Sequence, residues 1–119
     1  MRLIRAIFNG EDGSMGYKKG ELYFLELMER DGKYAVEIKR LDGTGYCPYS
    51  TYYSFLVNWL KPEAVEPRAD EKVFYEIKSK KAFVAKVVIN METKQSEYLV
   101  PLWVKTTPKG WKEVNYHVK

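Results

Sequence analysis

The segment from Cys47 to Leu60 most constrains the fold, because it predicts a short capped helix with an aromatic buried face. Ser50 suits the N-cap position, where a side-chain oxygen accepts a hydrogen bond from a first-turn backbone N–H. The following large apolar side chains recur at three- and four-residue spacings, as on one helical face: Tyr52, Phe55, Leu56 and Trp59. We expect Lys61-Pro62 to end the helix. The segment identifies a packing unit rather than an activity.

The residues before this helix predict a compact β unit. Four strands are expected, at residues 2–8, 21–29 and 34–41 and around Tyr46 and Cys47. A loop with four glycines, residues 9–20, separates the first two strands, and Asp31-Gly32 supplies a hairpin turn between the next two. Long loop, tight hairpins and a terminal helix follow one another in this order in small SH3-like barrels. We therefore predict a mainly β (α+β) chain that begins with a partly open SH3-like barrel and its one capped helix.

Two motifs in this half resemble a known group of proteins. They are Gly16-Tyr17-Lys18-Lys19-Gly20-Glu21-Leu22-Tyr23, and Gly45-Tyr46-Cys47-Pro48-Tyr49-Ser50 leading to Phe55-Leu56 and Asn58-Trp59. Both are similar to small uncharacterised proteins encoded by phages and prophages of Gram-positive bacteria. The resemblance covers the first half of the chain. It implies an accessory protein of a mobile element, a group in which small binding proteins and inhibitors of host defence systems are common, and it implies no active-site residue.

The second half predicts a separate set of strands. Residues 61–70 contain two prolines and mixed charge, which is typical of a linker, so we place one unit at 1–61 and another at 71–119. Strands are expected at 71–78, 82–90, 97–105 and 111–118, which would form an antiparallel β meander of three or four strands. Pro101 lacks a backbone donor and so predicts an edge strand or a bulge. We expect the two units to share one core.

Composition and charge narrow the classes of protein that this chain can belong to. A single cysteine among 119 residues excludes an internal disulfide and is typical of a reducing compartment. We found no apolar run long enough to span a bilayer, so we predict a cytoplasmic protein without a membrane partner, in the host cell if it is phage-encoded. Residues 61–119 contain twelve Lys or Arg against eight Asp or Glu, so the net charge of +4 lies in the second half.

No pattern of residues predicts chemistry. Cys47 and His117 are seventy positions apart and lack the spacing of a nucleophile pair or a zinc site. The glycines of residues 9–20 lead into a strand rather than a helix and so do not form a phosphate-binding fingerprint. Glu11 and Asp12 lack a partner base. We therefore predict no catalytic residue, no cofactor and no metal, and a protein that is not an enzyme.

The tyrosines predict a protein-binding surface, and a host protein is the expected partner. Tyr52 and Tyr53 lie about 100° apart around a helix, so one of them should be exposed. The predicted partner-binding residues are Tyr17, Tyr49 and Tyr53. In the alternative, nucleic acid binds to a set of lysines in the second half: Lys78, Lys80, Lys81, Lys105, Lys109 and Lys112. A pocket for a small nucleotide-like signal molecule is a third alternative, and an edge strand could form a homodimer.

Overall fold

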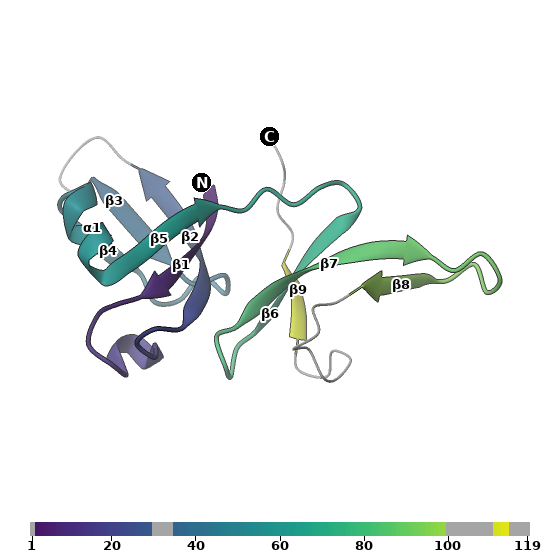
Figure 1. Cartoon of the computed structure of the whole chain (residues 1–119), viewed down its shortest axis with the longest axis horizontal. Helices are drawn as coiled ribbons and strands as arrows, with labels where there is room; N and C mark the ends of the chain where they lie inside the picture. Colours follow the sequence, from purple (N-terminus) through teal and green to yellow (C-terminus); the bar gives the residue numbers. More distant parts are fainter. Residues whose placement is uncertain (1, 30–34, 100–110, 115–119) are drawn as a thin grey trace. The chain divides into compact units, whose positions relative to one another are not determined.

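The computed structural model describes residues 2–29, 35–99 and 111–114. The described chain is mostly β, with antiparallel sheets and one α-helix, as the sequence predicts (Figure 1). It divides into two compact units, Met1–Val65 and Glu66–Lys119, which are called unit 1 and unit 2 below. Each unit has a sheet and a hydrophobic cluster of its own. The predicted sharing of one core between the units stays a prediction.

Unit 1 is a partly open barrel, whose described residues form one sheet of five strands. Its elements are β1 (Arg2–Phe8), the 3-10 turn η1 (Ser14–Gly16), β2 (Leu22–Glu29), β3 (Val36–Lys39), β4 (Cys47–Tyr49), α1 (Tyr52–Asn58) and β5 (Trp59–Ala64). The strands lie in the order β4-β3-β2-β1-β5, with every neighbouring pair antiparallel. The helix follows the fourth strand, as predicted, and contacts both edge strands, β4 and β5.

The core of unit 1 is built from alternating positions of the strands. Ile4, Ala6 and Phe8 of β1 face the same cluster as Tyr23, Leu25 and Leu27 of β2, because successive side chains of a strand point to opposite faces. Phe55 of α1 and Trp59 of β5 complete the cluster, and both are almost fully buried. Alternation in the sequence therefore sets which face of the sheet turns inward.

The helix is shorter and starts later than the sequence predicts. Thr51, not Ser50, is the N-cap: it has extended backbone angles, and its side-chain oxygen accepts a hydrogen bond of 3.0 Å from the backbone N–H of Ser54. The helix ends at Asn58, ahead of the predicted stop at Lys61-Pro62. Only Phe55 of the helix is buried, whereas Tyr52 is 48% exposed. The predicted aromatic face is thus shared between a short helix and the strand that follows it.

The first residues of the predicted linker belong to a strand. Residues 61–64 continue β5, which pairs with the free edge of β1 from Phe8↔Trp59 to Ile4↔Ala64. The register shifts between Arg5 and Ile7, where Lys61 takes a left-handed backbone angle of φ 49°. Pro62 fits because β5 is an edge strand, which leaves one row of N–H positions without a ladder partner. The prediction of a linker over 61–64 is therefore wrong.

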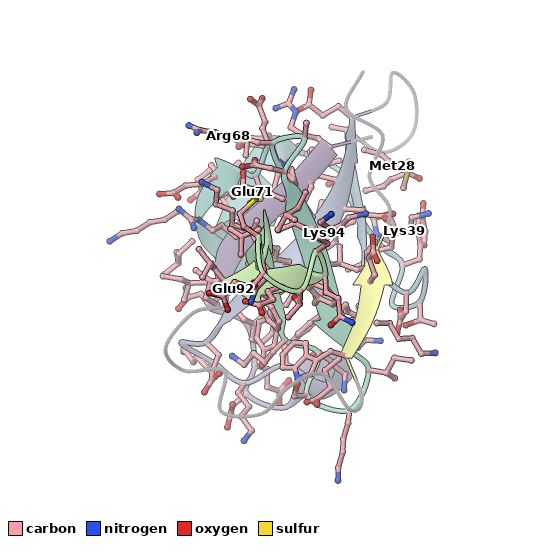
Figure 2. All side chains as sticks on the ribbon, turned by 90° about the vertical axis from the view of Figure 1, so that its right-hand side faces the viewer. Met28, Lys39, Arg68, Glu71, Glu92 and Lys94 are labelled. Atoms are coloured by element: carbon pink, nitrogen blue, oxygen red, sulfur yellow. The ribbon has the colours of Figure 1, made fainter. Side chains whose placement is uncertain are left out.

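Unit 2 is a four-stranded antiparallel sheet. Its strands are β6 (Glu71–Glu76), β7 (Ala82–Ile89), β8 (Ser96–Leu99) and β9 (Trp111–Val114). Strands β6 to β8 form the predicted antiparallel meander, with three strands rather than four, because the order β8-β7-β6-β9 puts β9 beside β6. β8 is an edge strand, and Pro101 lies outside the described residues. Figure 2 shows Glu92 and Lys94 on the turn that joins β7 to β8.

Aromatic packing also holds unit 2 together. Phe74 of β6 stacks on Phe83 of β7 with ring centroids 5.4 Å apart, and Trp111 of β9 meets Phe83 edge-on at 4.8 Å. These rings come from three neighbouring strands and share one face of the sheet. The returning strand β9 therefore adds its tryptophan to a pair of rings that β6 and β7 already form.

We predict that Thr51→Ala lowers the free energy of unfolding by about 1 kcal/mol, since it removes the helix N-cap. Ser50→Ala is the matched control, because Ser50 is exposed and precedes the cap. Urea unfolding followed by circular dichroism measures both variants. Equal losses of stability in the two variants would contradict the assignment of the cap to Thr51.

Candidate binding cavity

Unit 1 contains a cavity of about 270 Å³ under the loop that joins β1 to β2. Its lining comes from that loop, from the β3–β4 hairpin and from the junction of α1 with β5, and consists of Phe8, Gly10, Glu11, Ser14, Met15, Tyr17, Ile38, Gly45, Cys47, Tyr49, Asn58 and Trp59. Glu11, Ser14 and Met15 are exposed, so the cavity reaches the surface on the side of the loop. The aromatic side chains in the lining come from β1, the loop, β4 and β5.

Trp59 organises these aromatic side chains. Its ring lies 5.0 Å from that of Phe8 and 5.0 Å from that of Tyr17, centroid to centroid, and 6.3 Å from that of Tyr23. All three contacts are edge-on, the geometry in which the positive edge of one ring meets the negative face of another. Trp59 is only 1% exposed. The cavity therefore borders a rigid aromatic cluster.

Tyr49 links the two edge strands of the barrel across its open side. Its hydroxyl oxygen accepts a hydrogen bond of 3.2 Å from Trp59 Nε1 and one of 3.4 Å from Asn58 Nδ2. Burial raises the pKa of Tyr49, and the hydrogen bond from Asn58 opposes this rise. A side-chain bridge thus joins β4 to β5 where the two strands do not pair.

Arg40 holds the loop that joins β1 to β2 in place through contacts with Met15 and Tyr17. Its guanidinium donates to the backbone oxygen of Met15 and lies 5.0 Å from the ring centroid of Tyr17. The loop is also closed on itself, because the N–H of Gly13, in a left-handed conformation, donates to the Tyr17 carbonyl at 2.7 Å. Burial raises the pKa of Tyr17, and the positive charge of Arg40 opposes this rise. These contacts fix the loop that covers the cavity.

Two of the three tyrosines predicted to bind a partner line the cavity. Tyr17 is only 3% exposed, so the prediction that it lies on an exposed surface is wrong: the loop folds back and packs this ring on Trp59. Tyr49 is half-buried and lines the cavity from the other side. Tyr53 is 78% exposed on α1 and does not line it. The exposure of one of the two adjacent helix tyrosines is as predicted.

Some residues of the cavity were not singled out from the sequence as binding residues. The sequence assigns Glu11 only to an acid pair without a base, Asn58 only to a motif and Ser14 only to the loop at residues 9–20, although all three line the cavity. For Glu11 and Ser14 the one signal in the sequence is position, because a long glycine-containing loop after the first strand of a small barrel has to fold over one end of it. That signal indicates a loop near the core but does not say which side chains meet there.

Four of the six lysines that were predicted to bind nucleic acid lie in the described part of unit 2. Lys78, Lys80 and Lys81 lie on the turn that joins β6 to β7, and Lys112 lies in β9, paired in register with Tyr75. The backbone of this turn is closed by a hydrogen bond of 2.9 Å from the N–H of Lys80 to the Glu76 carbonyl. Two further predicted lysines fall outside the described residues: Lys105 and Lys109.

The described part of the chain contains neither a metal site nor a membrane-spanning helix, and no related protein was found. Among the described residues, no group of three or more His, Cys, Asp or Glu side chains is placed to hold a metal ion. Within the same part of the chain, no helix has the length and apolar character needed to cross a membrane. Comparison with protein-family models, with curated proteins and with solved structures found no match to this chain.

We predict that Tyr49→Phe lowers the free energy of unfolding by about 1–3 kcal/mol, because it leaves two donors without their acceptor, one of them on the buried Trp59. Tyr53→Phe is the matched control, since it removes a hydroxyl from an exposed side chain. Urea unfolding followed by tryptophan fluorescence measures the change. An unaltered unfolding midpoint in Tyr49→Phe would contradict the bridge.

We also predict a loss of stability in alkaline solution that depends on Tyr17. Because its pKa is raised in the folded chain, the unfolded chain loses this proton first, and stability is complete below the ordinary tyrosine pKa of about 10 and falls above it. Urea unfolding at several pH values between about 8 and 11 should give a shallower fall for Tyr17→Phe than for the wild-type chain. The exposed Tyr53→Phe should follow the wild type, and identical curves for all three proteins would refute the prediction.

Proposed function

We propose that this chain is a non-enzymatic protein-binding module, and that a segment of the partner protein inserts a side chain into the cavity of unit 1. The observation that carries the proposal is the cavity itself, which is lined by four aromatic rings and reaches the surface beside the loop. Aromatic side chains are enriched in protein interfaces, where they form the pockets that hold the most important residues of the partner.

The size and charge of the cavity favour a side chain over a nucleotide-like molecule. Sites for drug-sized ligands usually have volumes of about 300–1,000 Å³, and this cavity, at about 270 Å³, lies below that range. A phosphate group would need positive charge, and the described residues that line the cavity include no Lys or Arg. The binding of a signal nucleotide is therefore not the function that we propose.

The exposed side of α1 offers a second contact for the same partner. Tyr53 is 78% exposed and Val57, four residues later on the same helical face, is 51% exposed. Leu60, at the start of β5, is 39% exposed. This apolar surface is small, so we assign it a supporting role beside the cavity.

The resemblance of residues 16–59 to phage and prophage proteins supports a more specific form of the proposal. We infer an accessory protein of a mobile element that acts in the host cytoplasm and binds, or inhibits, a host defence factor. Inhibition of this kind requires affinity and steric occlusion rather than chemistry, which fits a module without a catalytic role.

The test is capture of a partner from a lysate of Gram-positive bacteria, with nuclease added, followed by mass spectrometry. We expect one protein in constant ratio to the tagged chain, and at least a tenfold loss of it from Ser14→Phe, which places a ring at the mouth of the cavity. Ser50→Phe is the matched control, because Ser50 is exposed and does not line the cavity. Equal capture by Ser14→Phe and the wild-type chain would overturn the proposal.

A second candidate function, nucleic-acid binding by unit 2, is favoured by the turn between β6 and β7, which presents Lys78, Lys80 and Lys81 together. Because such binding releases counterions, affinity for an oligonucleotide should fall steeply as salt increases. The double variant Lys78→Ala, Lys80→Ala should weaken binding regardless of base sequence and flatten the salt dependence, as measured by fluorescence anisotropy. An affinity that changes neither with the salt concentration nor in the double variant would refute this second candidate function.

A further inference from the structure

We propose that the side chain accepted by the cavity is basic, and that the partner presents an arginine to it. This inference rests on the proposed function, because it names the chemistry of the group that enters the cavity. Four observations support it: the charge of the cavity lining, the aromatic rings in that lining, the contact of Arg40 with Tyr17 and the volume of the cavity.

The charge of the lining is negative. Among the described residues that line the cavity, Glu11 is the one Asp, Glu, Lys or Arg. None of the ion pairs among the described parts of the chain involves Glu11. Since a buried charge is costly unless it is paired, a cation entering the cavity needs a carboxylate of this kind near the mouth.

The aromatic walls of the cavity suit a cation that is planar and weakly hydrated. A guanidinium is attracted to the electron-rich face of an aromatic ring and stacks on it, whereas an anion is repelled by that face. Four rings line the cavity: Phe8, Tyr17 and Trp59 are buried in contact with one another, and Tyr49 is half-buried. The combination of these rings with one carboxylate is therefore complementary to arginine.

Unit 1 already contains a contact of this type. The guanidinium of Arg40 lies 5.0 Å from the centroid of the Tyr17 ring and donates to the Met15 carbonyl. Arg40 contacts Met15 and Tyr17 of the lining but does not itself line the cavity, and its charge interacts with the nearby carboxylate of Asp42. Partial burial acts to raise the pKa of Asp42, but hydrogen bonds from Thr44 and the charge of Arg40 outweigh burial and hold that pKa below its usual value. Among the described residues Arg40 forms no ion pair with Glu11, so the Glu11 carboxylate is available to pair with a ligand.

The volume fits one long side chain. A water molecule takes up about 30 Å³ in the liquid, so about 270 Å³ has room for several waters or for a single flexible side chain that displaces them. The exposed loop residues Glu11 and Ser14 leave the mouth open to a peptide backbone outside. An arginine could then place its alkyl stem against the rings and its guanidinium beside the carboxylate.

The experiment is an NMR titration of the full ¹⁵N-labelled chain, in which the indole Nε1–H signal of Trp59 reports on the cavity. The probes are N-acetyl-arginine methylamide and N-acetyl-citrulline methylamide, which have the same shape but differ in charge. We expect the arginine probe to shift the Trp59 signal and to bind at least tenfold more tightly than the citrulline probe. Added salt should lower the affinity for the arginine probe but not for the citrulline probe, because salt screens the charge of the arginine.

A pair of variants tests the contribution of the Glu11 charge separately from that of the aromatic rings. Glu11→Gln should lower the affinity for the arginine probe several-fold and leave the affinity for the citrulline probe unchanged. Glu29→Gln is the matched control: it removes the same charge from an exposed residue that does not line the cavity, and it should bind both probes as the wild type does.

The outcomes distinguish this inference from the proposed function. Equal binding of both probes at Trp59 would overturn the basic ligand while the cavity kept its role as a binding site. If neither probe shifts Trp59 but Ser14→Phe abolishes capture of the host protein, the arginine inference alone is wrong. If neither probe binds and Ser14→Phe captures the partner normally, both proposals are overturned.

Discussion

The packing of Trp59 against the rings around it is the interaction on which the rest of unit 1 depends. This one side chain contacts Phe8 of β1, Tyr17 of the loop and Tyr23 of β2, and it donates a hydrogen bond to Tyr49 of β4. It stands at the first position of β5, directly after α1. The end of the helix, the start of the last strand and the closure of the loop are consequently coupled, because Trp59 directly follows α1, begins β5 and packs against Tyr17 of the loop.

The open side of the barrel shows how a small sheet can be completed without closing its ladder. β4 and β5 are the two edges of the sheet, and the described strands do not pair there. The hydroxyl of Tyr49 accepts two hydrogen bonds from the far side instead, and α1 contacts both strands. Residues of both edge strands, Tyr49 of β4 and Trp59 of β5, line the cavity together with the loop that joins β1 to β2. The binding site that we propose is thus bordered by the two unpaired edges, by aromatic rings and by an anchored loop.

The sequence predicted the strands and the helix better than it predicted their ends and the site. Alternation and turn residues identify β1, β2, β7 and the single helix, because these signals are local. The strand at 59–64 was missed because its ladder partner, β1, lies some fifty residues earlier, and because Pro62 is typical of a linker as well as of an edge strand. Tyr17 was predicted as part of a partner-binding surface, but it is buried. Its burial depends on Trp59 and Arg40, which no local pattern connects to it.

The placement of proline in unit 1 restricts the way in which any partner can attach. Pro48 lies in β4 and Pro62 in β5, so both edges of this sheet contain a residue that has no backbone N–H. A peptide that joins a sheet as an extra strand relies on a continuous row of backbone donors and acceptors along an edge, and here each row is interrupted. Strand addition is therefore disfavoured on both sides, among copies of the chain as well as with other proteins. The partner binding that we propose would therefore involve the side chains of unit 1 rather than the backbone of its sheet edges.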